Sequence, residues 1–123
     1  MNNSIYELQD ISFIAGETQD FFLRLYDVDN YRVDTDSSTC NFSLKKYGST
    51  LNQPLFSKMC EVKSEIIKNK SVEYFHLHLL PTETINLHGL YIYQFTIKSK
   101  RGVEVYQGML NIQYNVNNNF AIN

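Results

Sequence analysis

Two histidines one residue apart are the side chains whose type and spacing first suggest chemistry. His76 and His78 belong to an alternating polar and apolar run, so they share one face of an expected strand, with Tyr74 beside them. Two imidazoles at this spacing can bind zinc, but a zinc site needs a third or fourth ligand. His88 is the only other histidine, and it lies in a different segment. We therefore expect solvent-facing or interface histidines, with no metal and no cofactor.

A second group of potential metal ligands is acidic. Four aspartates crowd one short segment, at Asp27, Asp29, Asp34 and Asp36. Carboxylates two residues apart are typical of calcium loops, but an EF-hand loop also requires a central glycine and a closing glutamate. The corresponding positions are Arg32 and Ser38. We interpret these aspartates as turn formers that bond their own backbone.

Covalent catalysis has no recognisable motif in this chain. There is no Gly-x-Ser-x-Gly and no glycine-rich phosphate loop, so we expect no catalytic residue and no enzyme. Cys40 and Cys60 are each in phase with apolar neighbours on expected strands, which predicts small buried thiols. A disulfide between facing strands is the alternative, and a reducing compartment disfavours it.

The elements that position these residues are predicted to be strands, because the apolar pattern has a period of two almost throughout. The expected strands, about seven in number, cover residues 11–14, 20–26, 40–45, 60–65, 74–79, 91–98 and 103–114. In the last of them the apolar phase changes between Val105 and Leu110, which predicts a β-bulge near Gly108. A single helical turn over residues 83–87, capped by Thr82, is expected before the sixth strand.

The turn into the sixth strand is the best indicator of fold class. Gly89 can form a sharp corner, and Tyr91 is placed so that its ring packs inward while its hydroxyl bonds back to the turn. This arrangement is the tyrosine corner of immunoglobulin-like domains. We expect an all-β, immunoglobulin-like antiparallel sandwich over residues 1–116. Residues 117–123 form an asparagine-rich tail that is either disordered or docked on another surface.

Length and charge exclude several classes of function. The 123 residues suit one domain, and a formal net charge of -2 without a clustered basic patch indicates no nucleic-acid partner. No apolar run approaches the ~20 residues of a membrane span, so no membrane is expected. The opening residues, Met1 to Ser4, lack the basic and apolar regions of a signal peptide, which predicts synthesis in the cytoplasm.

The aromatic content is high for one small core, with nine tyrosines, eight phenylalanines and no tryptophan. Several aromatic side chains fall on the apparently outward phase of their strands. Tyrosine is frequent at interfaces because it offers a large contact area at low entropy cost. Either a loop or the tail of the same chain covers this face, or it is a subunit contact. The candidate interface comprises Phe22, Tyr26, Tyr74, His76, His78 and Tyr106.

The order and spacing of five segments resemble one known family over roughly residues 10–116. The segments are Gly16-Glu17-Thr18 leading into 21–25, the acidic turn 27–34, Phe42-Ser43-Leu44, the corner at 87–93 with its hairpin at 101–102, and 108–112. Together they resemble the N-terminal domain of the upper baseplate protein of phages infecting Gram-positive bacteria, and related immunoglobulin-like phage tail modules.

This resemblance implies a non-catalytic structural component of a bacteriophage tail or baseplate, present in the virion and made in the bacterial cytoplasm. Its partners would be other tail or baseplate proteins, with a homo-oligomer as a further option. Contact would use the aromatic outer face, an exposed edge strand or the tail, because edge strands invite pairing with another chain. The alternative is a carbohydrate- or cell-surface-binding sandwich, although such modules commonly use tryptophan, which this chain lacks.

Overall fold

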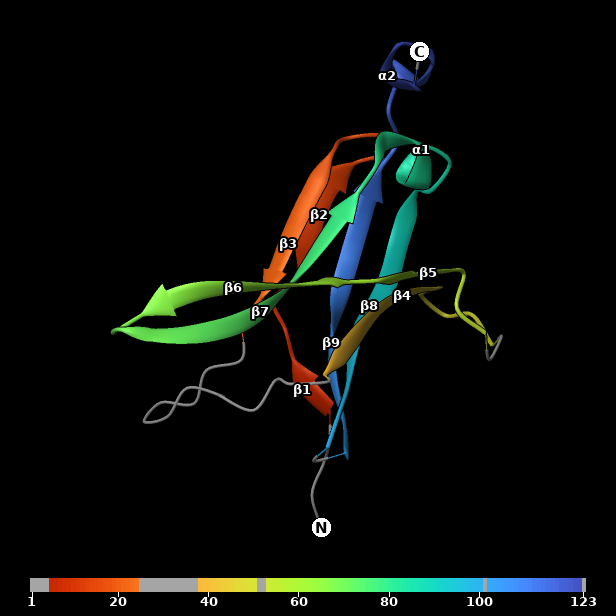
Figure 1. The fold of residues 1–123 in the computed structure, drawn as a ribbon. Coiled ribbons are helices and arrows are strands. Elements are labelled where there is room, and N and C mark those ends of the chain that lie inside the picture. The colour runs from red at the N-terminus through yellow and green to blue at the C-terminus, as the bar shows by residue number, and fades with distance from the viewer. Residues whose placement is uncertain (1–4, 25–37, 51–52, 101, 123) are drawn as a thin grey trace.

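The computed structural model describes residues 5–24, 38–50, 53–100 and 102–122, and these residues form two β-sheets and two short helices (Figure 1). The aspartate-rich segment and Tyr26 lie outside the described residues. The mixed sheet contains β1 (Ile5–Glu7), β2 (Ile11–Ile14), β4 (Thr39–Lys46), β5 (Phe56–Met59), β8 (Gly89–Ser99) and β9 (Gly102–Gln113). The antiparallel sheet contains β3 (Gln19–Leu23), β6 (Glu61–Ile67) and β7 (Lys70–Leu79). The helices are α1 (Pro81–Thr84) and α2 (Asn118–Ile122).

In the mixed sheet the strand order is β1-β9-β8-β4-β5, and β2 also pairs with β9. Both β1 and β2 run parallel to β9 and pair with successive parts of it, at residues 105–107 and 110–113. They therefore form one interrupted strand along the same edge of the sheet. All the other pairings in this sheet are antiparallel.

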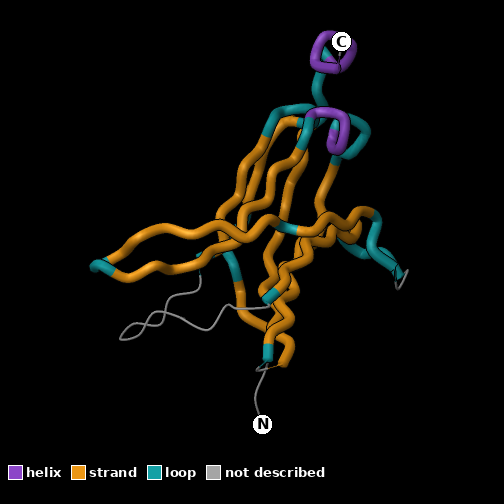
Figure 2. Tube along the Cα trace, viewed as in Figure 1, coloured by secondary structure: helices purple, strands orange, loops and turns teal. Residues whose placement is uncertain are grey.

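The second sheet has the order β3-β7-β6, with both pairings antiparallel. Only Cys60 separates β5 from β6, so the chain passes almost directly from one sheet into the other. The hairpin of β6 and β7 projects beyond the rest of the fold (Figures 1 and 2). Its turn is formed by Lys68 and Asn69, whose φ angles of 50° and 66° belong to the left-handed region that hairpin turns of this kind require.

The core lies between the two sheets and is built by the inward residues of each alternating strand. In strand β4 every second side chain from Cys40 to Leu44 is buried, and β8 does the same from Tyr91 to Ile97. The largest buried side chains include Phe75, Leu77, Leu79, Tyr93, Leu44, Ile97, Leu110 and Ile112. This arrangement is a β-rich, sandwich-like fold.

Two predictions about the strands are wrong. The described residues contain nine strands rather than about seven, because β1 and the half-exposed edge strand β5 were not expected. The predicted bulge near Gly108 is absent, since β8 and β9 pair in one unbroken register from Gly89 opposite Ile112 to Ser99 opposite Gly102. Gly108 faces inward, and a Cβ at this position would lie 2.7 Å from the Tyr93 ring. The glycine therefore makes room for a tyrosine.

The connection from β7 to β8 begins with a helical turn earlier than expected. Helix α1 starts with Pro81 and ends at Thr84, and Leu80 rather than Thr82 is its N-cap residue. The Glu83 carboxylate accepts hydrogen bonds from the Leu80 N–H at 2.7 Å and from Lys58 Nζ at 2.8 Å. Burial opposes ionisation of this carboxyl, but the two donors outweigh burial and hold its pKa below its ordinary value.

The corner itself is built around Tyr91, a residue that is 3% exposed. Its hydroxyl donates to the His88 carbonyl and accepts from the His88 N–H, both at 3.0 Å. Gly89 takes a φ of 108°, a left-handed conformation that favours glycine. Lys46 Nζ also donates to the His88 carbonyl, at 2.8 Å, and lies 5.0 Å from the centre of the Tyr91 ring.

The end of the chain carries a short helix. Within the tail, Asn118–Ile122 forms α2, which contacts α1 at the same end of the molecule (Figure 2). Asn115 Nδ2 donates to the Ala15 carbonyl at 2.8 Å and ties the start of the tail to the sandwich. Phe120 is 83% exposed. Among the described residues, neither helix is long and apolar enough to cross a membrane.

Candidate functional site

The candidate site is the outer surface of the antiparallel sheet, where β3 and β7 lie side by side. Their register places Asp20 opposite His78 and Phe22 opposite His76, while Phe21, Leu23, Phe75 and Leu77 point toward the core side of the same strands. Because alternate residues of paired strands share a face, the outward side chains form cross-strand pairs. We call this surface the β3–β7 outer face and define it by Asp20, Phe22, Arg24, Tyr74, His76 and His78.

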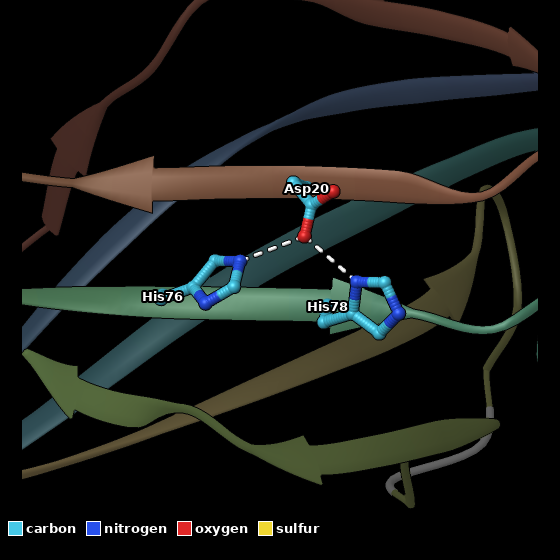
Figure 3. A group of neighbouring side chains, drawn as sticks. All are labelled: Asp20, His76 and His78. Carbon is cyan, nitrogen blue, oxygen red and sulfur yellow. Dashed lines mark hydrogen bonds and ion pairs between the residues drawn. The ribbon is translucent and has the colours of Figure 1, made fainter.

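At one end of this face, a carboxylate joins two imidazoles (Figure 3). Asp20 Oδ1 lies 2.7 Å from His76 Nε2 and 2.7 Å from His78 Nδ1. An ionised carboxylate only accepts, so both ring nitrogens carry the hydrogen in this arrangement. The hydrogen bonds from His78 and His76 hold the pKa of the Asp20 carboxyl below its ordinary value.

The two histidines have different surroundings. The His76 side chain is 11% exposed, whereas His78 and Asp20 are 40% and 42% exposed. The Nδ1 atom of His76 is buried and has no hydrogen-bond partner among the described residues. His76 is thus largely buried, while its two neighbours border solvent.

The rest of the face is a stack of aromatic and cationic side chains. The rings of Phe22 and His76 are stacked, with centroids 4.7 Å apart and an angle of 8° between their planes. The Arg24 guanidinium lies 4.7 Å from the centre of the Tyr74 ring and 5.4 Å from that of Phe22. Glu65 on β6 holds this guanidinium, with Nε 2.7 Å from Oε1. The stack is therefore held in one geometry by contacts from three strands.

The structure brings together four of the six residues predicted for an interface: Phe22, Tyr74, His76 and His78. Tyr26 lies outside the described residues. The outward orientation expected for Tyr106 is wrong, because its side chain is partly buried against the core and stands opposite the inward Phe95.

Sequence reasoning missed the contributions of Asp20 and Arg24 to this face. Both alternate in phase with Phe22, so their outward direction was readable from the sequence. Their contact partners could not be predicted from the sequence, because Asp20 and His78 are 58 residues apart and meet only through the register of β3 with β7.

The two cysteines lie next to each other and pack in or against the core. Both are free thiols, Cys40 is buried, and the Cys60 N–H donates to the Cys40 carbonyl at 2.9 Å. The hydrogen bond with the Cys60 thiol, together with burial, raises the pKa of Cys40 well above its ordinary value. Cys40 is thus an unreactive core thiol in this state.

No known family model matches this chain, and no curated protein is significantly similar to it.

Proposed function

We propose that this protein is a non-catalytic, immunoglobulin-like structural module of a bacteriophage tail or baseplate, which assembles with another virion protein through the β3–β7 outer face. The virion role is suggested by the resemblance of residues 10–116 to such modules, and the observation that carries the proposed interface is the stack of Phe22, His76, Arg24 and Tyr74 on the outer face of the sheet. Phe22 is 50% exposed although it is held by its neighbours.

The strand order supports the immunoglobulin-like assignment. In that fold, strands B, E and D belong to one sheet and strands C, F and G to the other. Here β3, β7 and β6 would correspond to B, E and D, and β4, β8 and β9 to C, F and G. Tyr91, at the start of β8 and two residues before Tyr93, would correspond to the corner tyrosine of that fold.

The chemistry of the face supports a protein partner. Aromatic residues and arginine are enriched in interface cores, and side chains already held in the bound geometry lose little entropy on binding. The charged side chains of the face have partners within the chain: Asp20 is hydrogen-bonded to the two histidines, and Arg24 is paired with Glu65. The expected partner therefore presents a mainly apolar and neutral polar surface.

Carbohydrate binding is the second candidate, because polar Asp20 and His78 lie beside exposed Phe22 on one face. Sugars bind to the free face of an aromatic ring, however, and here His76 stacks on one face of Phe22 while Arg24 lies over one face of Tyr74. This arrangement favours the protein partner.

The test uses the phage or prophage that encodes the chain. Deletion of its gene should prevent assembly of complete tails, and mass spectrometry of purified particles should detect the chain after complementation. Phe22→Ala with Tyr74→Ala should abolish incorporation into particles while circular dichroism stays unchanged. Tyr47→Ala is the matched control, since Tyr47 is 58% exposed and lies outside the face.

Two results would contradict the proposal. Particles that assemble normally without the chain would exclude a structural role. A glycan-array signal that is lost in the Tyr74→Ala variant, combined with absence of the chain from particles, would instead establish the carbohydrate alternative.

A further inference from the structure

We propose that Asp20, His76 and His78 form a binding site for a divalent transition-metal ion, with zinc as the reference ion. Each residue offers one ligand atom, and the three atoms all lie within 4.8 Å of one another. The ligands come from the neighbouring strands β3 and β7, and both imidazole nitrogens point toward the Asp20 carboxylate (Figure 3). The inference stands on this geometry alone and does not depend on the proposed assembly role.

The spacing of the ligand atoms is close to what a metal ion requires. Zinc binds nitrogen and carboxylate oxygen at about 2.0–2.2 Å, which places tetrahedral ligand atoms about 3.3 Å apart. Asp20 Oδ1 now lies 2.7 Å from each imidazole nitrogen. Asp20 Oδ1 must therefore move away from each imidazole nitrogen by about half an ångström. The two imidazole nitrogens, which lie within 4.8 Å of each other, must come to a similar spacing. The half-exposed side chains of Asp20 and His78 have room to turn, while His76 stays anchored on Phe22.

The donor set indicates which metals fit. Two imidazole nitrogens and one carboxylate oxygen suit zinc, nickel, cobalt and copper, whereas calcium and magnesium prefer six or more oxygen ligands. Three protein ligands leave a fourth position open, as in zinc sites that hold a water molecule. The exposure of Asp20 and His78 gives that position access to solvent.

The histidine tautomers determine how tightly the ion is held. A metal on His76 Nε2 moves the ring hydrogen to Nδ1, which is buried and has no acceptor among the described residues. Metal-bound histidines usually donate that hydrogen to a carboxylate or carbonyl, and loss of such a partner typically weakens binding about 10- to 100-fold. We therefore expect reversible binding that is weaker than that of a closed structural zinc site.

Isothermal titration calorimetry with zinc chloride tests the proposal on the full-length protein after any histidine tag has been removed. The expected result is saturable binding of one zinc per chain, reversed by EDTA. Asp20→Asn and His78→Gln should each weaken binding at least about 10-fold. Both positions are half-exposed, so the variants should fold, and circular dichroism checks that they do.

Matched controls separate this site from other ligands in the chain. Asp10→Asn removes the same charge at an exposed position, and His88→Gln removes the histidine outside the site. Cys60→Ala tests whether the thiols bind the metal. All three variants should retain wild-type affinity. Absence of saturable binding at millimolar zinc, or binding that survives both Asp20→Asn and His78→Gln, would overturn the proposal.

Discussion

Removing the Tyr91 hydroxyl is the sharpest test of how the corner stabilises this fold. The hydroxyl makes two hydrogen bonds with the His88 backbone, both at 3.0 Å. In a Tyr91→Phe variant the His88 carbonyl keeps its bond from Lys46 Nζ, so the His88 N–H is the group left without a partner. A buried hydrogen bond contributes about 0.5–1.5 kcal/mol, and an orphaned donor costs about 1–3 kcal/mol. Because the corner is only partly buried, we expect a loss of about 1–2 kcal/mol.

The assay is urea unfolding followed by circular dichroism, together with thermal melting. For a domain of this size each kcal/mol corresponds to a fall in Tm of roughly 3–5 °C. Tyr93→Phe provides a comparison, because its hydroxyl makes a single bond to the Gln9 carbonyl at 2.6 Å. Tyr47→Phe is the control, since that side chain is 58% exposed and should be neutral. If Tyr91→Phe unfolded at the same urea concentration as Tyr47→Phe, the corner would contribute nothing to stability.

Three further predictions concern the core, the helical turn and the cysteines. Gly108→Ala should destabilise the fold by about 1–3 kcal/mol in urea unfolding, because the new Cβ would lie 2.7 Å from the Tyr93 ring; unchanged stability would mean that the ring moves freely. The lowered pKa of Glu83 stabilises the folded state above the ordinary value of 4.5, and this contribution is lost as the pH falls through the folded-state pKa. Glu83→Gln should therefore show a smaller fall in Tm than the wild type between about pH 5 and pH 3, and parallel pH profiles would contradict this. Iodoacetamide should modify Cys60 before buried Cys40 in native protein, as read by peptide mass spectrometry; equal rates would show that Cys40 is accessible.

Local pattern was enough to identify most of the strands. Alternation places Leu44, Phe75 and Phe95 on inward positions, and the structure buries all three. The alternation predicted the wrong face where apolar residues are exposed rather than buried. Val103 lies at the β8–β9 hairpin end and is 53% exposed. Because the alternation places the valines of this segment on the inward face, it assigns Tyr106 to the outer face and predicts a bulge that does not exist. β-branched residues suit strands on either face, which is why they mislead at the end of a sheet.

Only part of the candidate site could be predicted from the sequence. A shared face for His76 and His78 follows from their spacing on one strand. The aspartate that joins them comes from another strand, and a shift of one residue in the register of β3 with β7 would turn Asp20 toward the core. No short-range signal specifies that register, because it depends on how both sheets pack their inward side chains.

The sequence by itself determined a β-rich domain with a corner at Gly89 and Tyr91 and an excess of outward aromatic residues, because these features depend on local periodicity and turn chemistry. The tertiary structure alone decided that β5 passes into the second sheet as β6, that Gly108 accommodates Tyr93, and that Asp20 meets two histidines. Those outcomes depend on contacts between residues far apart in the chain. Such contacts are selected by the packing of the whole core rather than by any one segment.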